Sequence, residues 1–401
     1  MRSRAVPARR GDLSYPLAFL GSHLSFIPLF ALLLPRRVAA VDPDNAVRLL
    51  SVLLLVGGLT ASVAHIAAGR WSDEWLKRHG SRRGLILIGL TLLVLAQIGI
   101  GIAHTAWTLL LAIIGFQLCL NVMFAPLGAL LSDYVPDERK GRVAGMLNAS
   151  LPLASLGTGL AAFLFPRDDA GAFLLVSFLI AVTVLPLLVR WPFAGVIPAP
   201  DQPQENSDLR AGAIADYVRV WTARLLIQLG AAFVINYFYL YLAGRTAASE
   251  ATEQMGVLAI AATLASLGSA ILAGRWSDAS ERRRPPMLAA ALACAVGLAA
   301  LAFQPPWTAT IAAFVLFHVG LAAFLSVDSA MVTQLIARSD RRGELLGWMN
   351  LTNTLPAIIV AILALSASGP HTRLDWSAAF SIAALLSIGG FALVARIRTI
   401  R

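Results

Sequence analysis

The sequence predicts an all-α integral membrane protein whose twelve transmembrane helices form two pseudo-symmetric bundles of six. Three observations predict this class. Of the 401 residues, 58% are hydrophobic and 13% are charged, whereas soluble domains average roughly 45–50% apolar and 25% charged residues. Apolar runs long enough to cross a bilayer, which takes about 20 residues, occur twelve times. Finally, one pentapeptide occurs twice, at 69–73 and 274–278.

The apolar runs divide into two sets of six. The first set covers residues 13–34, 47–69, 84–103, 107–132, 143–165 and 171–189. The second set covers residues 223–243, 255–274, 286–303, 307–336, 344–366 and 376–395. Residues 191–216 between the sets include four prolines and many polar residues, which is typical of an extended linker. We therefore expect a first bundle at 1–195, a cytoplasmic linker at 196–217 and a second bundle at 218–401.

Two matches indicate that the halves are repeats. Residues 69–73 and 274–278 are both Gly-Arg-Trp-Ser-Asp, 205 positions apart. Residues 141–148 (GRVAGMLN) match residues 343–350 (GELLGWMN) at an offset of 202. Repeated membrane units are a common architecture of secondary transporters, whose substrate sites lie near the repeat interface.

The basic residues predict the orientation and the compartment. If both termini are cytoplasmic, 26 of the 32 Lys and Arg residues fall in the tails and cytoplasmic loops, as the positive-inside rule requires. Because this distribution explains the net charge of +10, the charge does not indicate a nucleic-acid partner. The ratio of 30 Arg to 2 Lys is typical of a GC-rich bacterial genome. We expect a multi-pass protein of the bacterial cytoplasmic (inner) membrane.

Each pentapeptide closes an apolar run and is followed by arginines. A carboxylate flanked by arginines at a helix end can act as a latch whose strength depends on helix positions. The alternative is a solvated positive-inside loop without a gating role. For Asp73 the sequence offers Arg139, Lys140 and Arg142 before the fifth span, and Arg341 or Arg342 before the eleventh, as partners. The candidate gating residues are Gly69, Asp73, Arg82, Arg83, Arg142, Gly274, Asp278 and Arg342.

Residues 69–83 resemble the signature loop of the major facilitator superfamily, in which a small residue and an Asp end span two and a basic stretch follows. The resemblance covers the whole chain and implies the fold of that family, with Asp73 holding one face of the transporter closed. Residues 327–333 (VDSAMVT), 340–347 (DRRGELLG) and 350–356 (NLTNTLP) also resemble bacterial members of the glycoside/cation and sucrose/proton symporter group. Two departures stand out: the first two spans lack the intramembrane acid usual in that group, and span five lacks the Gly-Pro pair of drug/proton antiporters.

The strongest polar exception within a span is Asp328. It lies about 9 Å inside the tenth span at 1.5 Å per residue. A charged side chain at that depth is costly and generally faces a cavity or a partner. We therefore expect proton coupling or substrate contact, with a permanent structural ion pair or a simple helix-boundary residue as the alternatives.

Two histidines are further candidates for proton coupling. His23 and His318 lie in spans one and ten, and histidine titrates close to physiological pH. A neutral histidine bonded to a backbone carbonyl would serve packing equally well. His23 gains support because its repeat-mate at the 205 offset is Gln228, as a central site between pseudo-symmetric helices requires.

Amide side chains predict the chemistry of the cavity. Gln117 and Asn121 are four residues apart and so share a helix face, and Gln228 and Asn236 share another. Amides both donate and accept hydrogen bonds, which suits a neutral polyhydroxylated ligand. The candidate cavity residues are Gln117, Asn121, Gln228, Asn236, Asn148 and Asn350. Three aromatic residues are instead assigned to a belt at the outer membrane interface: Tyr237, Tyr239 and Tyr241.

These features predict a secondary active transporter that moves a small solute by alternating access, with proton symport and a sugar or glycoside favoured. The alternatives are proton-driven efflux of amphipathic drugs or metabolites, and a non-transporting membrane sensor or scaffold. The sequence has no phosphate loop of the GxxxxGK(S/T) type and no clustered metal-ligand or nucleophile motif, so we expect neither an enzyme nor a cofactor or metal. The expected partners are the lipid bilayer, the solute and protons, and the expected assembly is a monomer. The direction of transport stays open.

Overall fold

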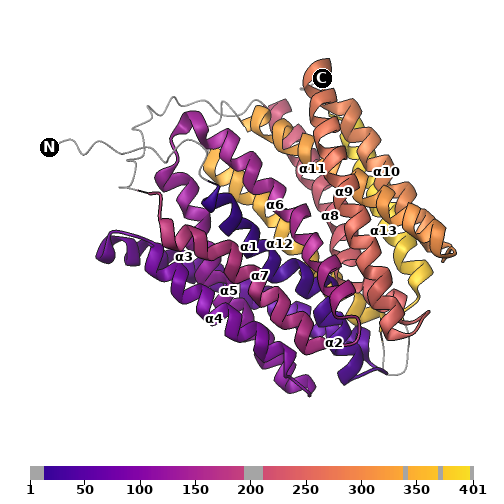
Figure 1. The fold of residues 1–401 in the computed structure, drawn as a ribbon. Coiled ribbons are helices and arrows are strands. Elements are labelled where there is room, and N and C mark those ends of the chain that lie inside the picture. The colour runs from indigo at the N-terminus through magenta and orange to yellow at the C-terminus, as the bar shows by residue number, and fades with distance from the viewer. Residues whose placement is uncertain (1–12, 194–210, 337–341, 369–373, 398–401) are drawn as a thin grey trace. The chain divides into compact units, whose positions relative to one another are not determined.

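The computed structural model describes residues 13–193, 211–336, 342–368 and 374–397, which form helices joined by short connections (Figure 1). The first half contains α1 (Ser14–Pro28), the π-helical turn η1 (Leu29–Leu33), α2 (Leu34–Val41), α3 (Ala46–His79), α4 (Arg83–Gly101), α5 (Ala106–Tyr134), α6 (Asp137–Leu164) and α7 (Asp169–Arg190). The second half contains α8 (Ala211–Ala243), α9 (Ala248–Ser280), α10 (Arg284–Ala302), α11 (Trp307–Ile336), α12 (Arg342–Ala367) and α13 (Trp376–Ala395). Twelve helical stretches of the described chain are long and apolar enough to cross a membrane. The predicted all-α membrane class is confirmed.

The first span, Ser14–Val41, combines α1, η1 and α2. Pro28 ends α1, and proline cannot supply a backbone N–H to a regular helical ladder. A π-helical turn follows directly, and such turns often mark a local break in a helix. Beyond it, Arg36 Nε lies 2.5 Å from Asp169 Oδ1, so an ion pair ties the end of the first span to the start of α7.

Two helices run past the apolar stretches that predicted them. α3 continues to His79 and α9 to Ser280, so both pentapeptides lie on helix. The expectation that residues 69–83 form a connecting loop was therefore wrong for most of that segment. Gly80 caps the C-terminal end of α3. Its φ of +68° lies in the left-handed region that glycine adopts without strain, and its N–H donates to the Leu76 carbonyl oxygen at 2.8 Å.

The predicted linker also needs a correction. Residues 211–217, expected to be extended, belong to α8, whereas residues 196–210 lie outside the described part of the chain. The apolar run that predicted this span starts at residue 223, because polar and basic residues before that point lower the local hydropathy. The helix continues through them, which moves residue 224 well inside α8.

Residue contacts divide the chain into two compact units, Met1–Asp201 with Leu242–Gly256, and Gln202–Tyr241 with Val257–Arg401. In the first unit α1 packs against α6 and α7, and α5 packs against α3 and α4. In the second unit α10 packs against α11 and α13. Close packing depends on glycine at two crossings: a Cβ on Gly89 would lie 2.6 Å from the Met123 nitrogen, and one on Gly320 would lie 2.6 Å from the Ala290 oxygen. The division into bundles at 1–195 and 218–401 stays a prediction.

Large apolar side chains cover much of the exposed surface. Examples are Val63 and Val189, each 72% exposed, and Phe178, 62% exposed. A soluble protein rarely exposes apolar residues on this scale, whereas spanning helices satisfy their backbone polar groups internally and turn apolar side chains to lipid. The surface therefore agrees with the twelve spans.

Candidate functional site

A buried ion pair on two spans forms the centre of the polar site in the second unit. Arg224 on α8 donates from Nη1 to Asp328 Oδ2 on α11 at 2.6 Å. The Asp328 side chain is fully buried and that of Arg224 is 14% exposed. Since removing two charges from water is expensive, such a pair persists only where hydrogen bonds and geometry offset the cost.

Amide side chains surround the ion pair on its exposed side. Arg224 Nη2 donates to Asn353 Oδ1 on α12 at 2.9 Å, and Gln228 Nε2 lies 3.3 Å from the same oxygen. Asn353 in turn donates from Nδ2 to Asn350 Oδ1 at 3.1 Å. We call these five residues the Arg224 cluster. It brings together three residues singled out in the sequence, Asp328, Gln228 and Asn350, and adds Arg224 and Asn353.

The ion pair is incompletely satisfied. Asp328 Oδ1 and Arg224 Nε are both buried, and neither has a hydrogen-bond partner among the described residues. A buried polar atom without a partner costs about 1–3 kcal/mol, so each such atom in a native structure calls for a physical explanation. One acceptor and one donor in the same ion pair match the hydrogen-bonding capacity of a hydroxyl group, which accepts and donates.

A second polar site lies in the first unit, around the sequence candidates His23, Asn121 and Gln117. His23 Nδ1 lies 2.9 Å from the Phe19 carbonyl oxygen and 3.3 Å from Ser150 Oγ on α6. Asn121 Nδ2 donates to the Gln117 carbonyl oxygen at 2.8 Å. On its other side, Asn121 Oδ1 lies 3.0 Å from Nδ1 of His65 on α3, a histidine that the sequence analysis did not select.

Aromatic rings enclose the His23 imidazole. Ring centroids of Phe19, Phe26 and Phe124 lie 5.1, 5.2 and 6.0 Å from that of His23. Phe124 also lies 6.2 Å from His65. We call these five residues the aromatic cluster. Edge-to-face and tilted rings at such distances attract one another and offer apolar faces to a planar or cationic ligand.

The remaining candidates lie elsewhere. Asn236 donates to the Ala232 carbonyl oxygen at 2.6 Å and His318 Nδ1 lies 2.9 Å from that of Phe314, each within its own helix. Asn148 is exposed on α6. The aromatic-belt prediction was wrong, because three tyrosine side chains are buried inside the protein instead of lying at its surface: Tyr237, Tyr239 and Tyr241.

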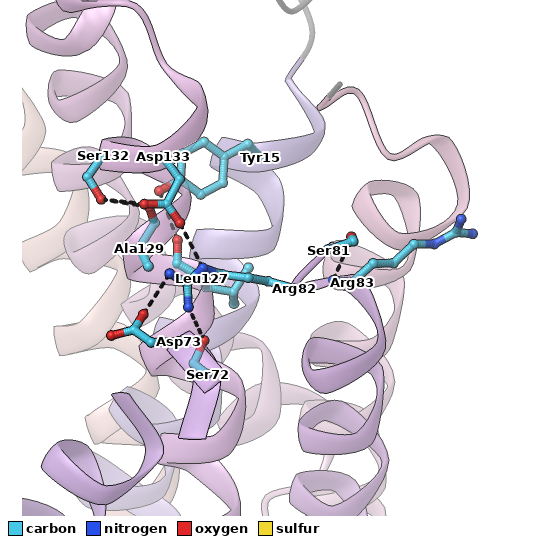
Figure 2. A network of polar contacts seen from close by, with 10 residues as sticks. All are labelled: Tyr15, Ser72, Asp73, Ser81, Arg82, Arg83, Leu127, Ala129, Ser132 and Asp133. Carbon is cyan, nitrogen blue, oxygen red and sulfur yellow. Dashed lines mark hydrogen bonds and ion pairs between the residues drawn. The ribbon is translucent and has the colours of Figure 1, made fainter. Parts of the chain in front are cut away.

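Arg82 organises the first pentapeptide (Figure 2). Its guanidinium donates from Nη2 to Asp73 Oδ1 and from Nε to Asp133 Oδ2, both at 2.8 Å, and from Nη1 to Ser72 Oγ. The Arg82 side chain is only 4% exposed. Burial alone would lower its pKa, but hydrogen bonds and charges from Asp73 and Asp133 outweigh burial and raise the pKa of Arg82 above its usual value. The guanidinium therefore stays charged and joins the ends of α3 and α5.

The second pentapeptide has the same arrangement. Arg283 donates from Nη1 to Ser277 Oγ at 2.8 Å and to Asp278 Oδ1. The arginine follows its serine by six residues here and by ten in the first half, so connections of different length bring an arginine to the same Ser-Asp pair of the pentapeptide. The two sites differ in their carboxylates, since Arg82 also holds Asp133.

The other gating candidates have diverse surroundings. The partner found for Asp73 is Arg82, which comes from its own helical hairpin and was not among the partners proposed from the sequence. A Cβ on Gly69 would meet no described atom within 4 Å, and one on Gly274 would make only an ordinary contact with Ser326. Arg83 and Arg142 are exposed, and the Arg342 side chain lies outside the described part of the structure.

Comparison with known proteins places the chain in a family. The model of the Major Facilitator Superfamily matches residues 17–248 and 220–401, so the chain belongs to this superfamily. It is therefore a multi-pass membrane protein and a secondary active transporter, not an enzyme. No curated protein sequence matched the chain.

Solved structures share the fold at low identity. A POT family transporter in complex with 5-aminolevulinic acid superposes with a TM-score of 0.73 and 12% identity over 97% of both chains. The nucleoside transporter NupG gives a TM-score of 0.65 and 16% identity over 96% of this chain and 100% of that one. A bacterial homolog of the human lysosomal transporter Spinster, inward-facing and occupied, gives 0.63 and 15% over 97% and 95%. At such identities the likeness establishes the fold alone.

Proposed function

We propose that this transporter couples the movement of a small polar solute to protons through Asp328, with a sugar or glycoside as the favoured substrate. The observation that carries the proposal is the ion pair between Arg224 and Asp328, 2.6 Å apart on two spans. Ionisable residues inside membrane spans are costly and usually mark substrate or ion pathways. The pair also lacks full hydrogen bonding within the described structure.

The proposed coupling depends on the ion pair, because the proton binds Asp328 and the solute binds Arg224. A proton bound to Asp328 removes the countercharge of Arg224, and breaking a buried pair in this way costs about 3–5 kcal/mol. Solute hydroxyls that bond Arg224 and the neighbouring amides offset that cost. Proton and solute therefore bind more tightly together than either binds alone, which is a positive coupling free energy between two sites.

The substrate class is inferred from the Arg224 cluster. Gln228, Asn350 and Asn353 offer donors and acceptors without net charge, a set suited to hydroxyl groups. In addition, residues 327–333 and 350–356, which resemble the glycoside/cation and sucrose/proton symporter group, contain Asp328, Asn350 and Asn353. Cytoplasmic termini, an inner-membrane location and a monomeric state belong to the same proposal.

The aromatic cluster supports a second candidate function, proton-driven efflux of amphipathic compounds. Phe19, Phe26 and Phe124 are partly exposed beside His23 and His65. Aromatic faces attract organic cations by roughly 0.5–2 kcal/mol per contact. An efflux protein would bind such compounds here and would not require the amides of the Arg224 cluster.

Charge displacement in proteoliposomes on a solid-supported membrane tests both candidates. Sugars and lipophilic cations are applied at two pH values to the wild type, to Asp328→Asn and to Asp375→Asn. Asp375 caps α13 by accepting from Ala378 N–H at 3.0 Å, and Asn is an equally good cap, so this variant is the matched control. Currents evoked by a sugar, dependent on pH and lost only in Asp328→Asn, are expected. Currents evoked only by lipophilic cations would contradict sugar symport and support the efflux function.

A further inference from the structure

A pocket outside both polar clusters lies at the ends of four helices of the first unit. Its volume is about 460 Å³, and its lining includes Trp75 and His79 from the end of α3, Arg83 from the start of α4, Tyr134 from the end of α5, and Trp191 and Phe193 after α7. The helical hairpin α3–α4 therefore contributes one wall and the ends of α5 and α7 contribute the other. All of these residues belong to the first unit.

The α3–α4 wall supplies hydrogen-bond donors. Arg83 has no ion-pair partner among the described residues, in contrast to Arg82 beside it, and its side chain points away from the Arg82 contacts (Figure 2). The Trp75 indole Nε1 is buried and has no described hydrogen-bond partner. Ser81 Oγ accepts from the Arg83 N–H at 3.2 Å, and a hydroxyl that accepts one hydrogen bond can still donate another. A ligand that faces three donors, one of them the Arg83 cation, is an anion.

The opposite wall is aromatic. Ring centroids of Tyr134 and Phe193 are 4.9 Å apart, and those of Trp191 and Phe193 are 5.5 Å apart. Tryptophan and tyrosine at the ends of spans sit at the level of lipid headgroups. Basic pockets between spanning helices at that level bind the phosphates of lipid headgroups.

We propose that this pocket binds a phosphate-bearing anion, and that the ligand is the headgroup of an anionic glycerophospholipid. Arg83, Ser81 and the Trp75 N–H hold the phosphate oxygens. The aromatic wall contacts the glycerol and the first carbons of the acyl chains. The site is independent of the solute and proton sites, because it uses no residue of the Arg224 cluster or the aromatic cluster.

Native mass spectrometry of the purified full chain in detergent tests the site. The probes are phosphatidylglycerol, phosphatidylcholine and inorganic phosphate. The variants are Arg83→Gln and Trp75→Phe, which keeps the ring and removes the N–H. Arg78→Gln is the matched control, because Arg78 lies on the same hairpin, is 71% exposed and is already paired with Glu74. Far-UV circular dichroism and size-exclusion elution verify that each variant is folded.

Retention of phosphatidylglycerol is expected to fall roughly tenfold in Arg83→Gln, the loss typical of one charge-assisted hydrogen bond, and less in Trp75→Phe. Arg78→Gln should retain the lipid as the wild type does. Displacement by millimolar inorganic phosphate would identify soluble phosphate as the source of the anion, and resistance to it would identify the lipid. Equal retention of phosphatidylcholine, or unchanged retention in folded Arg83→Gln, would overturn the proposal.

Discussion

Arg224 reaches from α8 to Asp328 on α11 and places Nη1 2.6 Å from Oδ2, so the two side chains form an ion pair between two spans of the second unit. A second nitrogen of the Arg224 guanidinium, Nη2, donates to Asn353 Oδ1, whereas Nε has no partner among the described residues. Loss of either charge would leave the other buried without its partner. The contribution of the ion pair to stability can therefore be measured by unfolding, and its contribution to transport by a separate flux assay.

Neutralising one partner of the pair should destabilise the protein, and neutralising both should restore it. Asp328→Asn or Arg224→Gln alone should lower the free energy of unfolding by about 3 kcal/mol, because an unpaired charge stays buried. The double variant should recover most of this loss. Thermal unfolding in detergent measures the three variants beside the wild type. Losses that add in the double variant would show that the two side chains do not interact.

Arg82 and Arg283 should tolerate lysine to different degrees. Lysine cannot reproduce the planar fork of arginine. Arg82→Lys should cost about 2 kcal/mol because Arg82 bonds two carboxylates and Ser72. Arg283→Lys should cost less than about 1 kcal/mol, since Asp278 is 71% exposed and such pairs contribute little. The same unfolding assay measures both, and equal losses would refute this ranking.

Alanine substitutions should destabilise the protein at a glycine that allows close helix packing, Gly89, and not at the glycine of the first pentapeptide, Gly69. Gly89→Ala would bring Cβ within 2.6 Å of the Met123 backbone, and such overpacking typically costs about 1–3 kcal/mol. Gly69→Ala meets open space and should not destabilise the protein, because alanine is also the better helix former. The melting temperatures of the two variants are compared with that of the wild type, and only Gly89→Ala should melt at a lower temperature. A larger loss at Gly69 would indicate a packing partner in another conformation.

Hydropathy predicted the spans well because each must be apolar over most of its length. It failed at helix ends, where polar residues continue a helix without adding to the apolar run. Arg224 was missed for this reason: it stood one residue after the predicted start of its span and was counted as a cytoplasmic arginine. Since α8 is already helical at Ala211, Arg224 lies about 20 Å along the helix from there at 1.5 Å per residue.

Residues that meet across helices were harder to predict than residues within one. Asp328 stood out because a carboxylate in an apolar run is rare, and Gln228 because of its repeat-mate. Arg82 and Asp133 are 51 positions apart, and His65 and Asn121 are 56 apart. No periodicity in the sequence links such positions, because the contact depends on how α3, α4 and α5 pack.

Solute exchange compared with gradient-driven accumulation tests the central proposal most directly. Exchange across proteoliposomes at equal pH needs solute binding but no net proton movement, whereas accumulation under a pH gradient needs coupling. With the solute that evokes currents in the wild type, Asp328→Asn should retain exchange and lose accumulation, while Asp375→Asn retains both. Accumulation by Asp328→Asn at the wild-type level would contradict the assignment of Asp328 as the coupling residue.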